Sequence, residues 1–156
     1  MPVDAARGTF THILFPTDGS EISQGAATTA ISLARSLGAK VTALHVVPPF
    51  LPPLPEMGVG FTYAMTEEEY DRATKAQAAE MLGKVRDEAS ESGVACDTVT
   101  AISSSPWDAI IKAAREHGCD AIVMASHGRK GLAGLVLGSE TTKVLTHSSI
   151  PVLVTR

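Results

Sequence analysis

A run of small residues in the last quarter of the chain has the composition of an anion-binding loop. Met124-Ala125-Ser126-His127-Gly128 is followed by Gly138-Ser139, with nine residues between Gly128 and Gly138. The apolar run before it is typical of a strand, and residues 139–147 after it are typical of a helix. Backbone N–H groups and a helix dipole favour negative charge at such a place, and glycines let a ligand approach closely. The segment therefore predicts a site for a phosphate-bearing ligand.

The spacing differs from two common phosphate-binding motifs. A Walker A loop reads GxxxxGK[ST], but the segment from Gly128 to Gly134 lacks the Lys-Ser/Thr pair, and Ser139 is followed by Glu140. The GxGxxG pattern of dinucleotide-binding folds is also missing. On spacing alone the loop predicts an anion site and does not name the ligand.

The elements that must position this loop alternate along the sequence as strands and helices. Ser20, Thr66 and Ser105 are predicted N-caps, and Gly38, Gly93 and Gly118 are placed to end helices. The alternation predicts an α/β fold, a single-domain open five-stranded parallel sheet with helices on both faces. The expected strands are 12–16, 41–47, 94–102, 121–124 and 150–155, and the expected helices are about 22–37, 66–92, 105–118 and 139–147.

A proline-rich segment at about 48–65 interrupts this alternation. It holds five prolines and two glycines, so we expect a loop. Two interpretations remain open. Either the segment is a disordered surface excursion, or it packs through apolar residues such as Phe50 and Phe61, as a lid or against a partner chain.

Composition excludes several classes of protein. A formal net charge of −4 argues against a nucleic-acid binder, because Arg129-Lys130 is the single local basic pair. No apolar run approaches the roughly 20 residues that span a bilayer, and the first eleven residues do not form a signal peptide. Cys96 and Cys119 lack any ligand spacing, which favours two reduced cysteines and a soluble, cytoplasmic protein.

Asp18 is the second candidate for ligand contact, because it ends the segment Pro16-Thr17-Asp18 after the first expected strand. Ligands of open α/β sheets bind at the carboxyl ends of the strands, where the strand order reverses. If the first and fourth strands are neighbours there, Asp18 and the glycine loop line one crevice. A carboxylate in that place can accept hydrogen bonds from ribose hydroxyls. Without the loop, a turn or helix-entry role beside Gly19 would be the favoured interpretation.

The full pattern resembles the universal stress protein family. The residues that carry the resemblance are Pro16-Thr17-Asp18, Leu44-His45-Val46-Val47, Met124-Ala125-Ser126-His127-Gly128, Gly138-Ser139 and the closing Ile150-Pro151-Val152-Leu153-Val154. The resemblance covers essentially the whole chain, 1–156. It implies a Rossmann-like fold of the adenine nucleotide alpha hydrolase type and a homodimer that forms through the final strand, Val152 to Val154. It also implies a stress-response or signalling module that binds an adenine nucleotide, ATP first and AMP or ADP next, with Mg²⁺ accompanying ATP.

The resemblance assigns the nucleoside side of the site to the ends of three strands. Asp18 would bind the ribose, and Pro16 and Thr17 would line the site. Val46 would meet adenine through its backbone, and Met124 would flank the nucleoside.

The same resemblance assigns the phosphates to the glycine loop. Gly128, Gly138 and Ser139 would hold them, and the N–H groups of Ser139 and Glu140 suit a phosphate at a helix start. Arg129 could add a charge-assisted contact, although a solvated loop face is the favoured interpretation for it and for Lys130.

Two residues depart from the family's pattern. Ala125 stands where the motif has its first glycine, so a Cβ there could crowd the ligand. Glu140 places a carboxylate at the start of the helix, where it could compete for the anion site. These departures leave open a dimeric interaction protein of the same family that binds no nucleotide.

An enzyme is the other open class. A nucleotide hydrolase or transferase could use the same crevice, and a flavoprotein-like domain could bind a different phosphate ligand there. His127 invites a catalytic role, but a structural histidine that fixes the loop is favoured, because the sequence offers only Ser126 and the distant Asp18 as partners. We therefore expect slow ATP hydrolysis at most. His45 is expected to be a satisfied core residue and Trp107 to pack on a helix.

Overall fold

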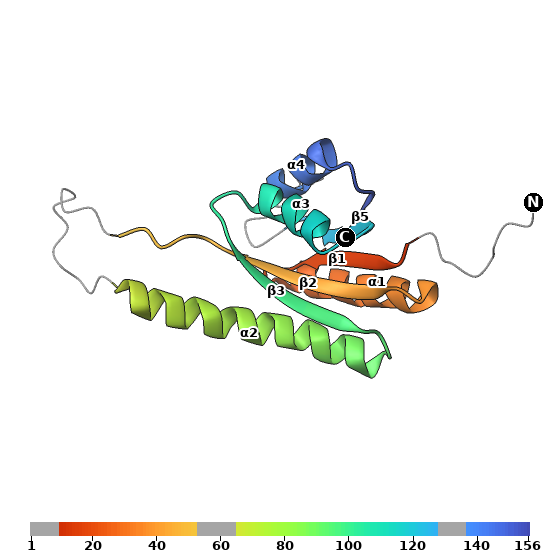
Figure 1. Cartoon of the computed structure of the whole chain (residues 1–156), viewed down its shortest axis with the longest axis horizontal. Coiled ribbons are helices and arrows are strands. Elements are labelled where there is room, and N and C mark those ends of the chain that lie inside the picture. Colours follow the sequence, from red (N-terminus) through yellow and green to blue (C-terminus); the bar gives the residue numbers. More distant parts are fainter. Residues whose placement is uncertain (1–9, 53–64, 128–136) are drawn as a thin grey trace, which may run out of the picture.

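A five-stranded parallel sheet forms the centre of the molecule in the computed structural model, which describes residues 10–52, 65–127 and 137–156 (Figure 1). The strand order is β3-β2-β1-β4-β5, and every neighbouring pair is parallel. The strands are β1 (His12–Pro16), β2 (Lys40–Val47), β3 (Cys96–Ile102), β4 (Ala121–Ala125) and β5 (Val152–Thr155). The predicted fold class, a single-domain open parallel sheet, is confirmed.

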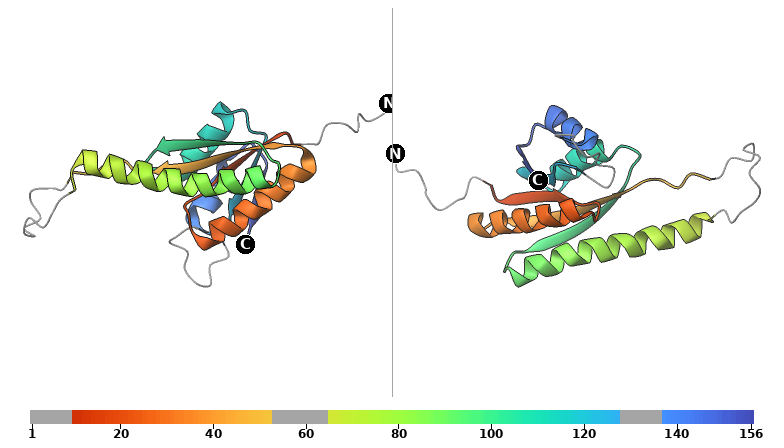
Figure 2. Two further views of the ribbon diagram at one scale, coloured as in Figure 1. Left: turned by 90° about the horizontal axis from the view of Figure 1, so that it is seen from below. Right: turned by 180° about the vertical axis from the view of Figure 1, so that it is seen from behind.

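Two helices cover each face of the sheet, so the layers are helix, sheet and helix (Figures 1 and 2). One face carries α1 (Glu21–Leu37) and α2 (Glu67–Glu91), and the other carries α3 (Pro106–Glu116) and α4 (Ser139–His147). The predicted elements are confirmed with boundaries that differ by at most two residues. Most of the proline-rich segment lies outside the described residues.

Helix ends follow the sequence signals with one exception. Ser20 Oγ accepts a hydrogen bond from the N–H of Ser23, and Thr66 forms the predicted capping box with Glu69. Gly38 ends α1 in the left-handed region at φ 66°, which favours glycine. The predicted cap at Ser105 is wrong in one respect, because this residue occupies the N-cap position of α3 without a side-chain cap bond.

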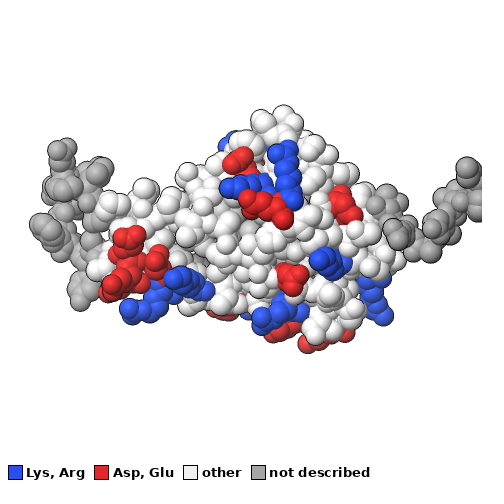
Figure 3. All heavy atoms as spheres, in the orientation of Figure 1, with Lys and Arg blue, Asp and Glu red and all other residues white. Residues whose placement is uncertain are grey.

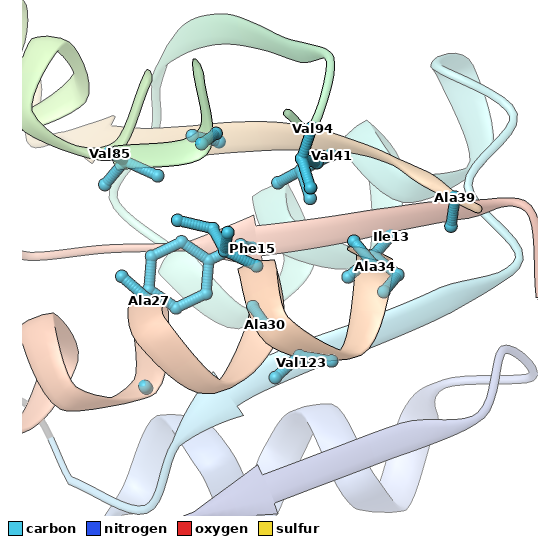
Figure 4. Packing of buried hydrophobic residues seen from close by; sticks show 14 of the residues in the cluster. Ile13, Phe15, Ala27, Ala30, Ala34, Ala39, Val41, Val85, Val94 and Val123 are labelled. Atoms are coloured by element: carbon cyan, nitrogen blue, oxygen red, sulfur yellow. The ribbon is translucent and has the colours of Figure 1, made fainter. Parts of the chain in front are cut away.

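Alternating strand residues divide the core into two layers. Phe15, which is 0% exposed, faces α1, and its ring lies near the alanine-rich side of that helix (Figure 4). Leu14 and Ile122 belong to the layer beneath α3 and α4. This alternation is what a parallel sheet covered on both faces requires.

The side of α2 that faces the sheet is buried over only part of its length. Ala78, Met81, Leu82, Val85 and Ala89 are buried, whereas Tyr70 is half-buried and Ala73 is exposed. The reason is geometric, because the amino-terminal half of α2 extends past the sheet (Figure 1). The Tyr70 hydroxyl instead donates to the carbonyl of Pro48, at 2.6 Å.

A carboxylate ties the amino ends of β1 and β4 together. Asp120 accepts hydrogen bonds from the N–H and hydroxyl of Thr11, both at 2.8 Å, and from the N–H of His12 at 3.0 Å. Beneath this clamp, His12 Nε2 lies 2.7 Å from the Thr42 hydroxyl inside the sheet. Both cysteines are free, and burial raises the pKa of the Cys119 thiol to about 11, so this thiol is neutral and unreactive.

His12 should make the stability of the protein depend on pH. Burial, assisted by the positive charge of Lys40, lowers the pKa of His12 below its ordinary value of 6.5. Well above pH 6.5 the imidazole is neutral in both states and contributes no pH dependence. As pH falls from there through the lower folded pKa, the unfolded chain binds more protons, so the free energy of unfolding should decrease.

The measurement is urea unfolding at a series of pH values for the wild type and for His12→Asn. The difference between their unfolding free energies should shrink as the pH falls below about 6.5, because only the wild type carries the imidazole. A difference that stays constant across this range would contradict the assignment.

Candidate functional site

The seam between β1 and β4 opens toward the carboxyl ends of the two strands. Register pairs join β1 to β2 over five residues and β4 to β5 over four, but β1 to β4 over only two, at Ile13–Ala121 and Leu14–Ile122. The strand order reverses at this seam, because β2 follows β1 on one side and β4 lies on the other. A crevice at such a switch point is the usual ligand site of open α/β sheets.

The turn after β1 is held by hydroxyl groups. Thr17 is buried, its N–H donates to the carbonyl of Leu44 at 2.8 Å, and its Oγ1 accepts from the Ser23 hydroxyl at 2.8 Å. His45 Nδ1 lies 2.9 Å from the Thr17 carbonyl, which confirms a satisfied histidine. Side chains from β2 and α1 therefore fix the backbone that presents Asp18.

Asp18 sits at the entry to α1, at the carboxyl end of β1. Its Oδ1 accepts a hydrogen bond from the N–H of Ser20 at 3.0 Å, and the residue is half-buried. This bond confirms the helix-entry role that the sequence allowed. It also fixes the carboxylate at the edge of the sheet where the strand order reverses.

Three of the predicted site residues share one face of the sheet. Val46 and Met124 both belong to the apolar layer beneath α3 and α4, and Pro16 pairs in register with Leu44 of that same layer. The strand ends therefore bring these residues to the edge where β1 and β4 separate.

The amino terminus of α4 is fixed against the end of β4. Gly138 donates its N–H to the carbonyl of Ser126 at 2.7 Å, and the Thr141 hydroxyl lies 3.0 Å from the Ala125 carbonyl and 3.2 Å from that of Ser126. A Cβ added to Gly138 would meet the Ser126 carbonyl oxygen at 3.2 Å. A side chain at Gly138 would thus be resisted by a close backbone approach and not by backbone strain, since its φ of −71° is open to any residue.

No side chain among the described residues caps α4. Gly138 occupies the N-cap position and makes no side-chain cap bond, whereas Ser20 and Thr66 cap α1 and α2. Ser139 begins the helix and is exposed. The first-turn N–H groups of a helix need external acceptors, so this end of α4 is suited to an anion.

Both departures from the expected motif are accommodated away from the crevice. The Ala125 side chain belongs to the core layer that faces α1, so its methyl group packs into the interior. The sequence allowed the Glu140 carboxylate to compete for the anion site. In the structure this carboxylate is engaged elsewhere. Its Oε2 accepts from the N–H of Trp107 at 2.8 Å, and its Oε1 lies 3.3 Å from Lys143 Nζ.

The predicted site residues therefore gather from both sides of the seam. The turn after β1, the end of β2, the end of β4 and the start of α4 lie at the same edge of the sheet, as parallel strands require. Gly128 and Arg129, with Lys130, lie outside the described residues. The sequence did not indicate the role of Thr141, the bond from Gly138 to the Ser126 carbonyl or the bond from Trp107 to Glu140, because these contacts join residues that are distant along the chain.

The His127 imidazole contacts the side chain of the preceding residue, Ser126. Nδ1 lies 3.0 Å from the Ser126 hydroxyl, and Nε2 is buried without a hydrogen-bond partner among the described residues. No carboxylate in this part of the chain orients the imidazole, as a general base would require. Trp107 packs on His147 with ring centroids 4.6 Å apart, which confirms its packing role.

The described residues do not indicate a metal site or a membrane span. They contain no group of three or more His, Cys, Asp or Glu placed to hold a metal ion, and no helix among them is long and apolar enough to cross a membrane. Acidic and basic side chains are interspersed on the face shown in Figure 3. That face offers no continuous basic stripe of the kind that binds nucleic acid.

Comparison with known proteins agrees with this geometry. Residues 9–156 match the Universal stress protein family. The chain is 34% identical to Universal stress protein MJ0531 of Methanocaldococcus jannaschii, over 92% of this chain and 81% of that one. It is 30% identical to Universal stress protein YxiE of Bacillus subtilis, over 94% and 99% of the two chains. The solved structure of universal stress protein UspA from Lactobacillus plantarum superposes with a TM-score of 0.80 at 27% identity, over 97% and 99%. Because the family match spans nearly the whole chain and the first two relatives are at least 30% identical over most of their length, the chain belongs to the universal stress protein family.

Proposed function

We propose that the protein binds an adenine nucleotide, with ATP as the first candidate, in the crevice at the carboxyl ends of β1 and β4. The observation that carries the proposal is the amino terminus of α4, which no side chain of the described residues caps and which is anchored beside the point where these strands separate. Its N–H groups and dipole favour phosphate oxygens. AMP and ADP offer the same kind of group and are the next candidates.

The nucleoside would lie across the strand ends. Asp18 would accept hydrogen bonds from ribose hydroxyls, and this role is supported by the contacts of Thr17 and Ser20 that fix the turn carrying it. Val46 and Met124 give the crevice an apolar wall, against which a base can pack. The phosphates would then extend to Gly138 and Ser139.

Two solved proteins of this fold support a nucleotide as the ligand class. One universal stress protein was solved in complex with cAMP, and another, from Archaeoglobus fulgidus, in complex with dAMP. They are 22% and 21% identical to this chain, so they share the fold and serve as support for the proposal.

We further propose a binding or signalling module of the stress response that acts in the cytoplasm. Slow hydrolysis of ATP is the most turnover we expect, because His127 bonds to Ser126 and lacks a carboxylate partner in the described part of the chain. Mg²⁺ would be held chiefly by the phosphates and water, as is common for this ion.

The decisive experiment examines ligand carried by the purified protein. Freshly purified protein is denatured, the supernatant is separated by ion-exchange chromatography, and the melting temperature of the dialysed protein is measured with ATP and with GTP. Adenine nucleotide in the supernatant, or a rise in melting temperature with ATP that exceeds the rise with GTP, is the expected result. Absence of both would overturn the proposal.

We also propose that the protein is a homodimer that pairs through β5. This strand lies at one edge of the sheet, with Leu153 46% exposed and with Val152 and Val154 half-buried. An apolar edge strand is an aggregation hazard unless another chain covers it. Antiparallel pairing of two β5 strands would satisfy both the backbone groups and the apolar side chains.

Leu153→Asp is expected to convert the dimer to a monomer, because the new carboxylates would face each other across the strand pair. Sedimentation velocity gives the mass of each species. Leu145→Asp is the matched control, since Leu145 is similarly exposed, at 40%, but lies on α4. A monomeric wild type, or a control that dissociates equally, would contradict pairing through β5.

A further inference from the structure

Glu140 joins two helices whose amino termini lie at the same edge of the sheet. Its Oε2 accepts the backbone N–H of Trp107 at 2.8 Å, across 33 positions of sequence. That N–H belongs to the first turn of α3, whose N-cap residue Ser105 makes no side-chain cap bond. A side chain on α4 thus supplies the acceptor that α3 lacks.

A second contact between the same helices lies near the other end of α4. The rings of Trp107 and His147 are 4.6 Å apart, so Trp107 is held by its backbone to the first turn of α4 and by its ring to the last. The Nζ atom of Lys143 donates to the other carboxylate oxygen of Glu140, Oε1, at 3.3 Å. The charge of Glu140 is therefore engaged by a helix terminus and a cation.

We infer that Glu140 is a positioning residue that sets the amino terminus of α4 for phosphate binding by docking it on α3. The inference rests on the proposed nucleotide function of that terminus. Two anchors hold the start of α4 to the end of β4, through the Gly138 N–H and the Thr141 hydroxyl, and Glu140 supplies a third anchor, to α3. An anion site gains affinity when its donors are fixed before the ligand arrives.

The position of Glu140 combines two opposing effects. The tie to Trp107 orders the helix terminus, whereas the negative charge opposes a phosphate near the same first turn. Glu140→Gln keeps an acceptor for the Trp107 N–H and removes the charge. Glu140→Ala removes both. The two substitutions should therefore change nucleotide affinity in opposite directions.

The test measures dissociation constants of AMP and ATP by calorimetry for the full-length wild type and both variants. We expect Glu140→Gln to bind ATP about two- to fivefold more tightly, with a smaller gain for AMP, which carries less charge. We expect Glu140→Ala to bind both on the order of tenfold more weakly, because a hydrogen bond to a charged group is lost. Glu116→Ala, which removes an exposed acid that pairs with Lys112 at 3.8 Å, is the matched control and should bind like the wild type.

Amide exchange separates this inference from the nucleotide proposal. Without any nucleotide, the Trp107 amide should lose protection in Glu140→Ala and keep most of it in Glu140→Gln. Equal protection in the two variants, or equal affinity losses, would overturn the positioning role. Tighter binding by both variants would show that the charge competes directly and would also overturn it. If the wild type binds neither nucleotide, the proposed function fails and amide exchange alone decides whether Glu140 docks the helices.

Discussion

Replacing Gly138 with valine is expected to abolish the rise in melting temperature that ATP produces, while the protein stays folded. A Cβ at this position would lie 3.2 Å from the Ser126 carbonyl oxygen and 3.5 Å from the His127 Cα. Both neighbours are backbone atoms, so the helix terminus must move away from β4. Such overpacking costs about 1–3 kcal/mol, which is small beside the roughly 5–15 kcal/mol of a typical domain.

The effect on binding should be much larger than the effect on stability, because the displaced N–H groups are the proposed phosphate donors. Gly138→Ala should give an intermediate loss, since it adds only the Cβ. Gly25→Ala is the control, because a Cβ on that α1 glycine meets nothing within 4 Å and should raise helix stability slightly. A valine variant that ATP still stabilises fully would show that the phosphates are held elsewhere.

Phe15→Ala is expected to lower the free energy of unfolding by about 3–5 kcal/mol. Phe15 is 0% exposed, and its side chain is the largest of those that are fully buried among the described residues. It packs in the layer shared by α1 and the sheet (Figure 4), so its removal leaves a cavity between them. It also directly precedes Pro16, and the loss should loosen the turn that presents Asp18.

Urea unfolding at one fixed protein concentration measures this effect, since a dimer would make stability depend on concentration. Leu51→Ala is the matched control, because Leu51 is 83% exposed and truncation should change stability by no more than about 0.5 kcal/mol. A loss below about 1 kcal/mol for Phe15→Ala would contradict close packing of the ring.

Local signals explain why most of the fold was predictable from sequence. The capping box at Thr66, the cap at Ser20 and the left-handed Gly38 act within a few residues of their own position, so each can be recognised in isolation. The position of strands such as β2 also follows from local pattern, because strands buried on both faces appear as largely apolar runs.

Features that depend on distant partners were not predictable. Nothing near Glu140 in the sequence indicates that its carboxylate caps α3. Likewise, nothing near Ser105 indicates that its hydroxyl makes no cap bond to this helix. Ala73 follows the helical spacing of α2 but is exposed, because spacing does not show where the sheet ends. The Asp120 clamp likewise joins segments more than one hundred residues apart.

The orientation of Ala125 changes the assessment of the candidate site. From sequence, an alanine in place of the family's glycine counts against ligand binding. In the structure its side chain packs toward α1, on the face of the sheet opposite Val46 and Met124. The methyl group therefore costs the crevice little space.

The strand order also constrains how the chain folds during synthesis. β1, β2 and β3 are neighbours within residues 12–102 and emerge first, whereas β4 and β5 follow near the carboxyl end. The alanine side of α1 packs in one layer with Val123 and Ala125 of β4, so part of it stays uncovered until β4 is made. We expect a ribosome-bound chain that stops before β4 to be collapsed, protease-sensitive and prone to chaperone capture. Full protection from protease should come only when β4 and β5 have been made and have paired with the rest of the sheet.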